Sequence, residues 1–226
     1  MGNRIIFNGL EEQEYGRREA FNSLRTNIQF CGADLKTILF TSCAPNEGKS
    51  TVTFELARSI AENGKKVILV DADLRKSVML GRYKAQAAQK RTGGLSHYLS
   101  GQASIGEILC NTNIPNFDVI LTGPLSPNPT ELLNGELFSE LLTLLRVSYD
   151  MIIIDSPPLG SVIDAAVIAP HCDGAVLVVE SNATSHRLAV DVKKQLEMAD
   201  CRILGAVLNK VRIEKTKYYK YYGEYK

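Results

Sequence analysis

The sequence lacks a charge excess of either sign, a long apolar run and a signal-peptide core. Its 26 Lys and Arg residues stand against 25 Asp and Glu, a net charge of +1, so no strong field favours nucleic acid or an anionic membrane as a partner. No apolar run approaches the ~20 residues of a membrane-spanning helix. We therefore expect a cytoplasmic protein that does not bind nucleic acid and that reaches a membrane, if at all, through a partner.

Paired cysteines are also missing. The chain has five cysteines, an odd number, and none stands in a CxxC pair. This pattern argues against a disulfide framework and against a zinc site. The cysteines are interpreted as small hydrophobic residues in a reducing compartment. They are Cys31, Cys43, Cys110, Cys172 and Cys201.

Short apolar runs alternate with helical patterns from Lys36 onward, which is typical of βαβ units around a parallel sheet. A chain of 226 residues, of which 45% are hydrophobic and 23% charged, fits one such domain with short extensions. We predict a helical N-terminal extension over 1–35, an α/β domain over 36–211 and a flexible tail over 212–226.

The expected strands are continuously apolar, so helices should cover both faces of the sheet. They span residues 37–41, 67–70, 117–121, 151–154, 175–179 and 203–208. Helices are predicted over about 11–30 and over 49–62, where Asn63-Gly64 ends the second one. The polar stretch 82–102 is predicted to be a mobile loop. Parallel strands place their carboxyl ends on one edge, where ligands bind in such sheets.

Residues 42–51, SCAPNEGKST, connect a predicted strand to a predicted helix, which is the context that a phosphate-binding P-loop requires. Backbone N–H groups there converge on phosphates, and the helix dipole favours their negative charge. Gly48 lets the backbone approach closely, Lys49 brings positive charge to the β- and γ-phosphates, and Ser50 offers a hydroxyl to Mg²⁺. The nucleotide-binding residues predicted in this loop are Pro45, Asn46, Glu47, Gly48, Lys49, Ser50 and Thr51.

The match to GxxxxGK(S/T) is imperfect, because Cys43 stands where the pattern has its first glycine. A bare GK(S/T) also arises at an ordinary helix start. Carboxylates at the ends of two other apolar strands argue against that alternative. Asp71 and Asp73 are two residues apart and point to the same face in extended backbone, and Asp155 ends its strand as a Walker B aspartate does. Three carboxylates on the same edge as the loop favour a Mg²⁺-nucleotide site.

Together these motifs resemble the bacterial tyrosine kinases of the capsular and exopolysaccharide type, and the resemblance spans essentially the whole chain. Residues 41–51, TSCAPNEGKST, resemble the family's TSxxPGEGKST, and residues 69–75, LVDADLR, resemble its second Walker A motif. The PNPTELL segment within 123–133 and the tyrosine cluster at 218–225 are similar to two further family features. The resemblance implies a parallel central sheet flanked by helices, in a P-loop NTPase of the deviant-Walker type.

The resemblance also implies a protein-tyrosine kinase that uses ATP and Mg²⁺ and autophosphorylates its tail, which enters the site of a neighbouring subunit. Asp71 would take the phenol proton and Lys49 would stabilise the γ-phosphate, although the roles of Asp71 and Asp73 could be exchanged. The implied metal ligands are Ser50, Asp73 and Asp155. The implied phosphoacceptors are Tyr218, Tyr219, Tyr221, Tyr222 and Tyr225. Asn209, at the end of the last strand, could contact the nucleotide base.

The partners implied by the resemblance are a separate integral-membrane activator, which recruits the chain to the inner face of the membrane, and a cognate phosphotyrosine phosphatase. The implied process is capsular or exopolysaccharide synthesis and export. We expect the N-terminal helix or the rim near the nucleotide to contact the activator. Homo-oligomers are implied as well.

Two positions depart from the family pattern. Asn46 replaces a glycine of the loop, and because Asn tolerates a positive φ better than other non-glycine residues, the loop conformation should persist. The N-terminal ExxRxxR motif, which the family links to ring assembly, has Asn22 at its first arginine position, between Glu19 and Arg25. Losing that arginine removes a bidentate partner for carboxylates, so we expect a ring to be weaker or absent.

Other functions remain open from the sequence. The tail could stack on single-stranded nucleic acid or have no role. The chain could be a non-kinase ATPase switch like the septum-positioning and plasmid-partitioning proteins, but their signature lysine corresponds to Ala44 here. An iron–sulfur carrier of the same superfamily would need paired cysteines. A nucleotide-dependent scaffold for polysaccharide machinery is a further alternative.

Overall fold

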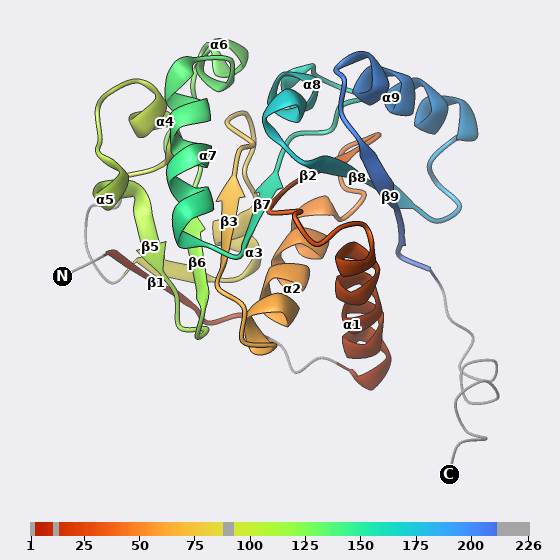
Figure 1. Cartoon of the computed structure of the whole chain (residues 1–226), viewed down its shortest axis with the longest axis horizontal. Coiled ribbons are helices and arrows are strands. Elements are labelled where there is room, and N and C mark those ends of the chain that lie inside the picture. The colour runs from red at the N-terminus through yellow and green to blue at the C-terminus, as the bar shows by residue number, and fades with distance from the viewer. Residues whose placement is uncertain (1–2, 11–13, 88–92, 212–226) are drawn as a thin grey trace.

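The computed structural model describes residues 3–10, 14–87 and 93–211, and Figure 1 shows a central sheet with helices on both faces. The nine strands of this part of the chain are β1 (Asn3–Phe7), β2 (Thr37–Ser42), β3 (Val67–Asp71), β4 (Ala85–Ala87), β5 (Leu109–Asn111), β6 (Phe117–Ile120), β7 (Met151–Asp155), β8 (Gly174–Glu180) and β9 (Ile203–Asn209). The tail over 212–226, with all five predicted phosphoacceptors, lies outside the described residues.

The sheet has the strand order β4-β1-β5-β6-β3-β7-β2-β8-β9. From β6 to β9 every neighbouring pair is parallel, whereas β4 and β5 run antiparallel to β1 and β6, respectively. The prediction of a mainly parallel sheet flanked by helices is therefore confirmed. The helices are α1 (Tyr15–Phe30), α2 (Lys49–Glu62), α3 (Met79–Arg82), α4 (Leu95–Leu99), α5 (Ile105–Ile108), α6 (Pro129–Leu133), α7 (Glu136–Ser148), α8 (Asp164–Ile168) and α9 (His186–Met198), with a 3₁₀ turn at Ala169–His171.

Alternate residues of the central strands feed two separate cores. Leu39 of β2 packs with Phe138 of α7 and Val192 of α9 on one face. Phe40, its neighbour, packs with Phe54 of α2 on the other face, which α1 also covers (Figure 1). Because both faces are buried, the central strands carry apolar side chains at consecutive positions.

Three short elements lie where the sequence predicted something else. Inside the range 1–35, where we expected only a helix, β1 pairs with β4 and β5 and buries Ile5 and Phe7. The prediction of a mobile loop over 82–102 is wrong for its described part, which includes β4 and α4. Leu95 and Leu99, one helical turn apart, are both buried and hold α4 against the core.

The helices and the thiols of the described residues can be compared with the sequence pattern. Among the described residues no helix is both long and apolar enough to cross a membrane. Cys43, Cys110 and Cys201 are buried, and all five cysteines are free thiols. Burial of these side chains agrees with their interpretation as small hydrophobic residues.

Candidate active site

Three adjacent strands end at the same edge of the sheet and bring the predicted site residues together. In the register of the sheet, Asp155 at the end of β7 is paired with Asp71 on β3 and with Phe40 on β2. Strand β2 leads into the P-loop, so the P-loop and both carboxylates lie side by side. This proximity follows from the order β3-β7-β2, which the sequence alone does not reveal.

The P-loop changes direction at two residues with positive φ. Gly48, directly before α2, has a φ of 88°, and Asn46 has a φ of 68°. The expectation that Asn46 keeps the loop conformation of a glycine is therefore confirmed. A Cβ at Gly48 would also lie 2.1 Å from Nδ2 of Asn209, so a larger residue would displace that side-chain amide. That amide donates a hydrogen bond to the carbonyl of Glu47 at 2.8 Å.

Glu47 supports the loop from inside. Its Oε2 accepts hydrogen bonds from the backbone N–H groups of Cys43 and Ala44, at 2.7 and 2.9 Å, and its Oε1 accepts one from the hydroxyl of Thr184. The Glu47 side chain is buried and is directed into the loop, so any nucleotide contact of this residue would use its backbone. The contact with Thr184 spans 137 residues of sequence and has no local signal.

Lys49 and Asp155 form a buried ion pair. The Lys49 ammonium lies 2.5 Å from Oδ1 of Asp155, and the two side chains are 6% and 2% exposed. The pair places the P-loop charge directly beside the Walker B carboxylate. Because water has little access there, the charge of each side chain is compensated by the charge of the other.

Asp71 is buried next to this pair. Its Oδ2 accepts a hydrogen bond from the hydroxyl of Ser77, and its Oδ1 accepts one from the backbone N–H of Asp73 at 3.3 Å. Burial, together with the nearby charge of Asp155, raises the pKa of Asp71 to about 7. A carboxyl group with this pKa can exchange a proton near neutral pH, as a general base must.

Asp73 is half-buried and sits on the connection after β3. Its Oδ1 accepts hydrogen bonds from the backbone N–H groups of Arg75 and Lys76, at 3.2 and 2.9 Å, which leaves Oδ2 for a ligand. The hydroxyl of Thr122, just beyond β6, donates to the Asp73 carbonyl at 3.1 Å. These bonds fix the position of the second carboxylate relative to the first.

The same connection is anchored by a buried carboxylate that the sequence did not identify. Arg75 donates from Nε and Nη2 to the two oxygens of Asp164, at 2.7 and 2.9 Å, and Asp164 is fully buried at the start of α8. The hydroxyl of Thr130, within the PNPTELL segment, donates to Asp164 at 2.6 Å. Burial alone would raise the pKa of Asp164, but the bonds from Arg75 and Thr130 hold it below its ordinary value.

Thr51 and Asn209, two of the predicted nucleotide-binding residues, form hydrogen bonds within the chain. The partner of Asn209 is the Glu47 carbonyl described above. Nη1 of Arg82 on α3 donates to the Thr51 hydroxyl at 2.6 Å. Lys210, next to Asn209, donates from Nζ to the carbonyl of Asn46 and to Oε2 of Glu180, both at 2.7 Å. The end of β9 thus braces the P-loop.

The P-loop can accept phosphates and a metal ion together. The N–H groups of Thr51 and Val52 both donate to the Gly48 carbonyl, at 3.1 and 3.0 Å, so the amides before them have no acceptor in their own helix and are available to an anion. Among the described residues, no group of three or more His, Cys, Asp or Glu side chains could hold a metal by itself. Mg²⁺ at a P-loop takes most ligands from phosphates and water, so the Ser50 hydroxyl and the carboxylates of Asp73 and Asp155 fit that requirement.

Comparison with known proteins identifies the relatives of this chain. A family model described as an AAA domain matches residues 36–207. The chain is 44% identical to tyrosine-protein kinase CpsD of Streptococcus agalactiae over 207 residues, which cover 92% of this chain and 89% of that protein. It is 37% identical to tyrosine-protein kinase YwqD of Bacillus subtilis (strain 168), over 91% of this chain and 86% of that protein.

Solved structures give the same result. The chimerical protein CapA2B2 matches with a TM-score of 0.83 and 31% identity, over 90% of this chain and 88% of that chain. The kinase domain of the Escherichia coli tyrosine kinase ETK matches with a TM-score of 0.79 and 30% identity, over 88% and 78%. The cell division ATPase MinD of Pyrococcus furiosus is less similar, with a TM-score of 0.65 and 26% identity, over 80% and 74%.

The fold and the loop define a P-loop protein of the class that uses nucleoside triphosphates. Within that class, the chain belongs to the family of bacterial protein-tyrosine kinases. The resemblance that its motifs indicated is confirmed, and the alternative of a non-kinase ATPase switch is not favoured.

Proposed function

We propose that this kinase transfers the γ-phosphate of ATP to the tyrosines of its own C-terminal tail, presented by a second copy of the chain. The observation that carries the proposal is the position of Asp71. This buried carboxyl group, whose pKa is raised to about 7, is paired across the sheet with Asp155, which in turn contacts Lys49. A proton acceptor on β3 therefore stands beside the β7 carboxylate that contacts the P-loop lysine.

Nucleotide binding would require the ion pair between Lys49 and Asp155 to open. Lys49 would then bind phosphate oxygens, and the Asp155 carboxylate, Asp73 and the hydroxyl of Ser50 would be the residues that hold Mg²⁺. Mg²⁺, when bound with ATP, neutralises charge on the phosphates. Phosphoryl transfer requires positioning and charge neutralisation more than covalent help from the protein.

Asp71 is assigned as the base and Asp73 as the metal ligand, because their surroundings differ. The raised pKa of Asp71 suits a group that takes the phenol proton of the acceptor. Asp73 is half-exposed and accepts hydrogen bonds from two backbone N–H groups through Oδ1, which leaves Oδ2 accessible to a cation. The reversed assignment would place the metal at the more deeply buried carboxylate.

The proposed setting is capsular or exopolysaccharide synthesis, regulated with a separate integral-membrane activator and a cognate phosphatase. Similarity to the streptococcal CpsD kinase and to the chimerical CapA2B2 structure supports this setting. The activator would recruit the chain to the inner face of the membrane. We also propose that the chain forms homo-oligomers. A closed ring of subunits would be weakened, because Asn22 replaces the first arginine of the ExxRxxR motif.

Incubation of the full chain with Mg-ATP, followed by intact-mass analysis and peptide mapping, tests the proposal. We expect phosphate on tyrosines within 212–226. The control is the double variant Lys49→Met/Asp155→Asn, which removes both members of the ion pair, so that neither is left as an unpaired charge. A parallel incubation includes the cytoplasmic segment of the membrane activator. If the tail carries no phosphate in either incubation, the proposal is wrong.

A further inference from the structure

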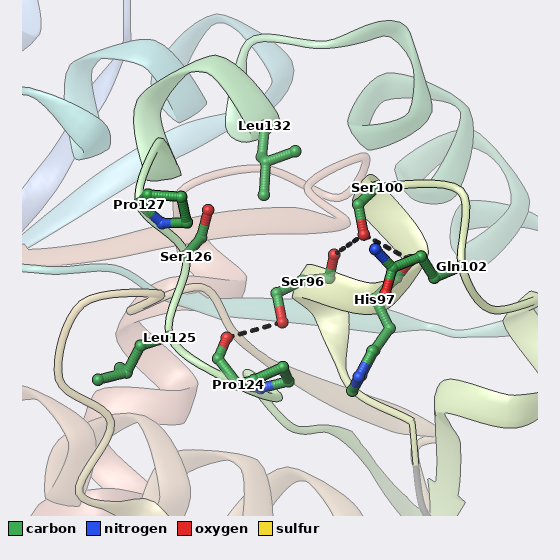
Figure 2. Close-up of a pocket in the computed structure, with 9 residues that line it drawn as sticks. All are labelled: Ser96, His97, Ser100, Gln102, Pro124, Leu125, Ser126, Pro127 and Leu132. Atoms are coloured by element: carbon green, nitrogen blue, oxygen red, sulfur yellow. Dashed lines mark hydrogen bonds between the residues drawn. The ribbon is translucent and has the colours of Figure 1, made fainter.

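A cavity of about 180 Å³ lies between α4, the connection after β6 and α6 (Figure 2). Ser96 and His97 of α4 form one wall, and Pro124, Pro127 and Leu132 form the opposite one. The cavity is well below the ~300–1,000 Å³ of pockets for drug-sized ligands. It is therefore suited to one side chain and is too small for a nucleotide.

Both walls of the cavity are fixed to each other. The N–H groups of Leu95 and Ser96 donate to the carbonyls of Leu121 and Thr122, at 2.7 and 2.9 Å. The Ser96 hydroxyl donates to the carbonyl of Pro124 at 2.8 Å, as Figure 2 shows. These bonds join the start of α4 to the connection after β6, so the cavity is preformed.

The cavity lies on the side of Asp71 away from the P-loop. Strand β6 is the neighbour of β3 on the side opposite to β7, and Ile120 of β6 is paired with Val70, directly before Asp71. The connection that lines the cavity continues from this point, and Thr122 on it is bonded to Asp73. The P-loop lies on the β7 side of Asp71, which leaves the β6 side for an acceptor tyrosine.

The chemistry of the lining favours an aromatic ring with a polar tip. The described residues that line the cavity include two prolines, two leucines, three serines, His97 and Gln102, with no Lys, Arg, Asp or Glu among them. Proline and leucine side chains pack on ring faces. The hydroxyls of Ser96 and Ser100 already donate within the chain, so their oxygens would accept a hydrogen bond from a phenol. A tyrosine side chain satisfies both requirements.

We propose that this cavity, here named the anchor pocket, binds one tyrosine of the tail of a second copy while another tyrosine of the same tail reacts at Asp71. The inference rests on the proposed function. Every tyrosine among Tyr218, Tyr219, Tyr221, Tyr222 and Tyr225 has another two or three residues away. In extended backbone that spacing spans about 7–10 Å, so two tyrosines of one tail can occupy two neighbouring sites. The cluster thus supplies an anchor for each acceptor.

The test separates donor and acceptor chains. The donor chain is the full-length kinase with all five tail tyrosines changed to Ala, so that it cannot be an acceptor. The acceptor chain is the full-length double variant Lys49→Met/Asp155→Asn, which keeps its tail and cannot catalyse. Initial rates of phosphate transfer at increasing acceptor concentration give kcat and KM, and KM for ATP is measured in parallel.

Leu125→Asp in the donor chain places a charge at the anchor pocket, on a side chain that is 70% exposed. We expect KM for the acceptor chain to rise about tenfold, the order expected when a partly buried ring contact is lost, with kcat and KM for ATP unchanged. Leu132→Ala, which removes part of the wall, should act in the same direction. Leu144→Asp on α7, 50% exposed and seven residues before β7 begins, is the matched control and should leave KM unchanged.

A second comparison changes the acceptor chain. Tyr221 is kept, and the other four tail tyrosines are changed either to Phe or to Ala. The Phe set retains the rings, so its KM should stay within about twofold of the unmodified tail, while the Ala set should raise KM about tenfold.

The outcomes separate the two proposals. Equal KM values for the Phe and Ala sets, or an unchanged KM with both Leu125→Asp and Leu132→Ala, would overturn the anchor pocket and leave the kinase function standing. Absence of phosphate on the unmodified acceptor, in a donor preparation that binds ATP, would overturn transfer between copies and the anchor pocket with it.

Discussion

The ammonium of Lys49 lies 2.5 Å from the carboxylate of Asp155, and both side chains are almost completely buried. This contact joins the P-loop to the Walker B strand, so it combines two roles. Without ligand it neutralises two buried charges, and in the proposed mechanism it opens for catalysis. Its two roles can be separated by substitution.

Lys49→Met leaves Asp155 as an unpaired buried charge next to Asp71. We expect this substitution to lower the free energy of unfolding by about 3–5 kcal/mol, the usual cost of removing one partner of a buried pair. Lys49→Met/Asp155→Asn should recover most of that loss. Urea unfolding of the two variants and the unmodified chain measures both effects. Equal stability of the single and double variants would contradict the expectation.

The pKa of Asp71 predicts how stability depends on pH. Because burial raises this pKa from 3.8 to about 7, the folded chain holds the proton more tightly than the unfolded chain does. The contribution of Asp71 to stability is therefore fully present below about pH 4 and is lost as pH rises through about 7. The difference between the two pKa values corresponds to about 4 kcal/mol, as an order of magnitude.

Asp71→Asn removes this dependence and the catalytic base at once. In urea unfolding, the variant should gain stability over the unmodified chain as pH rises from 4 to 7. Its kcat for tail phosphorylation should fall by about 10²-fold or more, with ATP affinity nearly unchanged. Asp73→Asn should instead weaken Mg²⁺ binding, so that more Mg²⁺ is needed for half-maximal activity. If Asp73→Asn rather than Asp71→Asn abolishes the pH dependence of stability, the assignment of the two carboxylates is reversed.

Asn46 should be replaceable by Gly but not by Ala. At a φ of 68°, a residue with an ordinary Cβ is strained by about 1–2 kcal/mol, whereas Gly adopts this conformation freely. We expect Asn46→Ala to lower stability and to weaken ATP binding, and Asn46→Gly to change either little. Calorimetric titration with ATP and thermal unfolding of both variants check the prediction, which fails if the two behave alike.

The sequence predicted that the P-loop and the three aspartates lie at one edge of the sheet, but it did not predict the side chains that support them. The P-loop and the three aspartates follow apolar strands, so their position at one edge depends only on the parallel arrangement of the sheet. The side chains that hold them come from distant segments. Thr184 reaches Glu47, and Asp164 binds Arg75 from 89 residues away. Such contacts depend on how helices pack, and no spacing along the chain encodes them.

The sequence also failed to predict short elements, because their own residues carry too little pattern. Strand β4, three residues long, is stabilised by its pairing with β1 and has little pattern of its own. Helix α4 has five residues, too few for a period to be recognised. By contrast, α2 spans 14 residues with a continuous buried stripe, and its bounds at Lys49 and Glu62 match the prediction.

Arg75 should act as a positioning residue for Asp73. Its guanidinium bonds both oxygens of the buried Asp164, and a lysine at this position can make only a single contact. We expect Arg75→Lys to lower stability by about 1–3 kcal/mol and to lower kcat about tenfold, with ATP affinity nearly unchanged. Arg146→Lys, the same change in the pair with Asp173, is the control and should leave kcat unchanged. An unchanged kcat in Arg75→Lys would show that Asp73 keeps its position without this anchor.

Phosphorylation of the tail should loosen the association between copies of the chain. Each phosphotyrosine adds about −1.5 to −2 charge, so a modified tail would be repelled by Asp71 and Asp73 at the site that it has to enter. Mass photometry at low ionic strength should therefore show smaller assemblies after incubation with Mg-ATP, and larger ones again after phosphatase treatment. A chain with all five tail tyrosines changed to Phe should not respond to either treatment. The difference should shrink in high salt, because screening weakens repulsion between exposed charges. Equal assembly sizes before and after phosphatase treatment would mean that the tail does not control association.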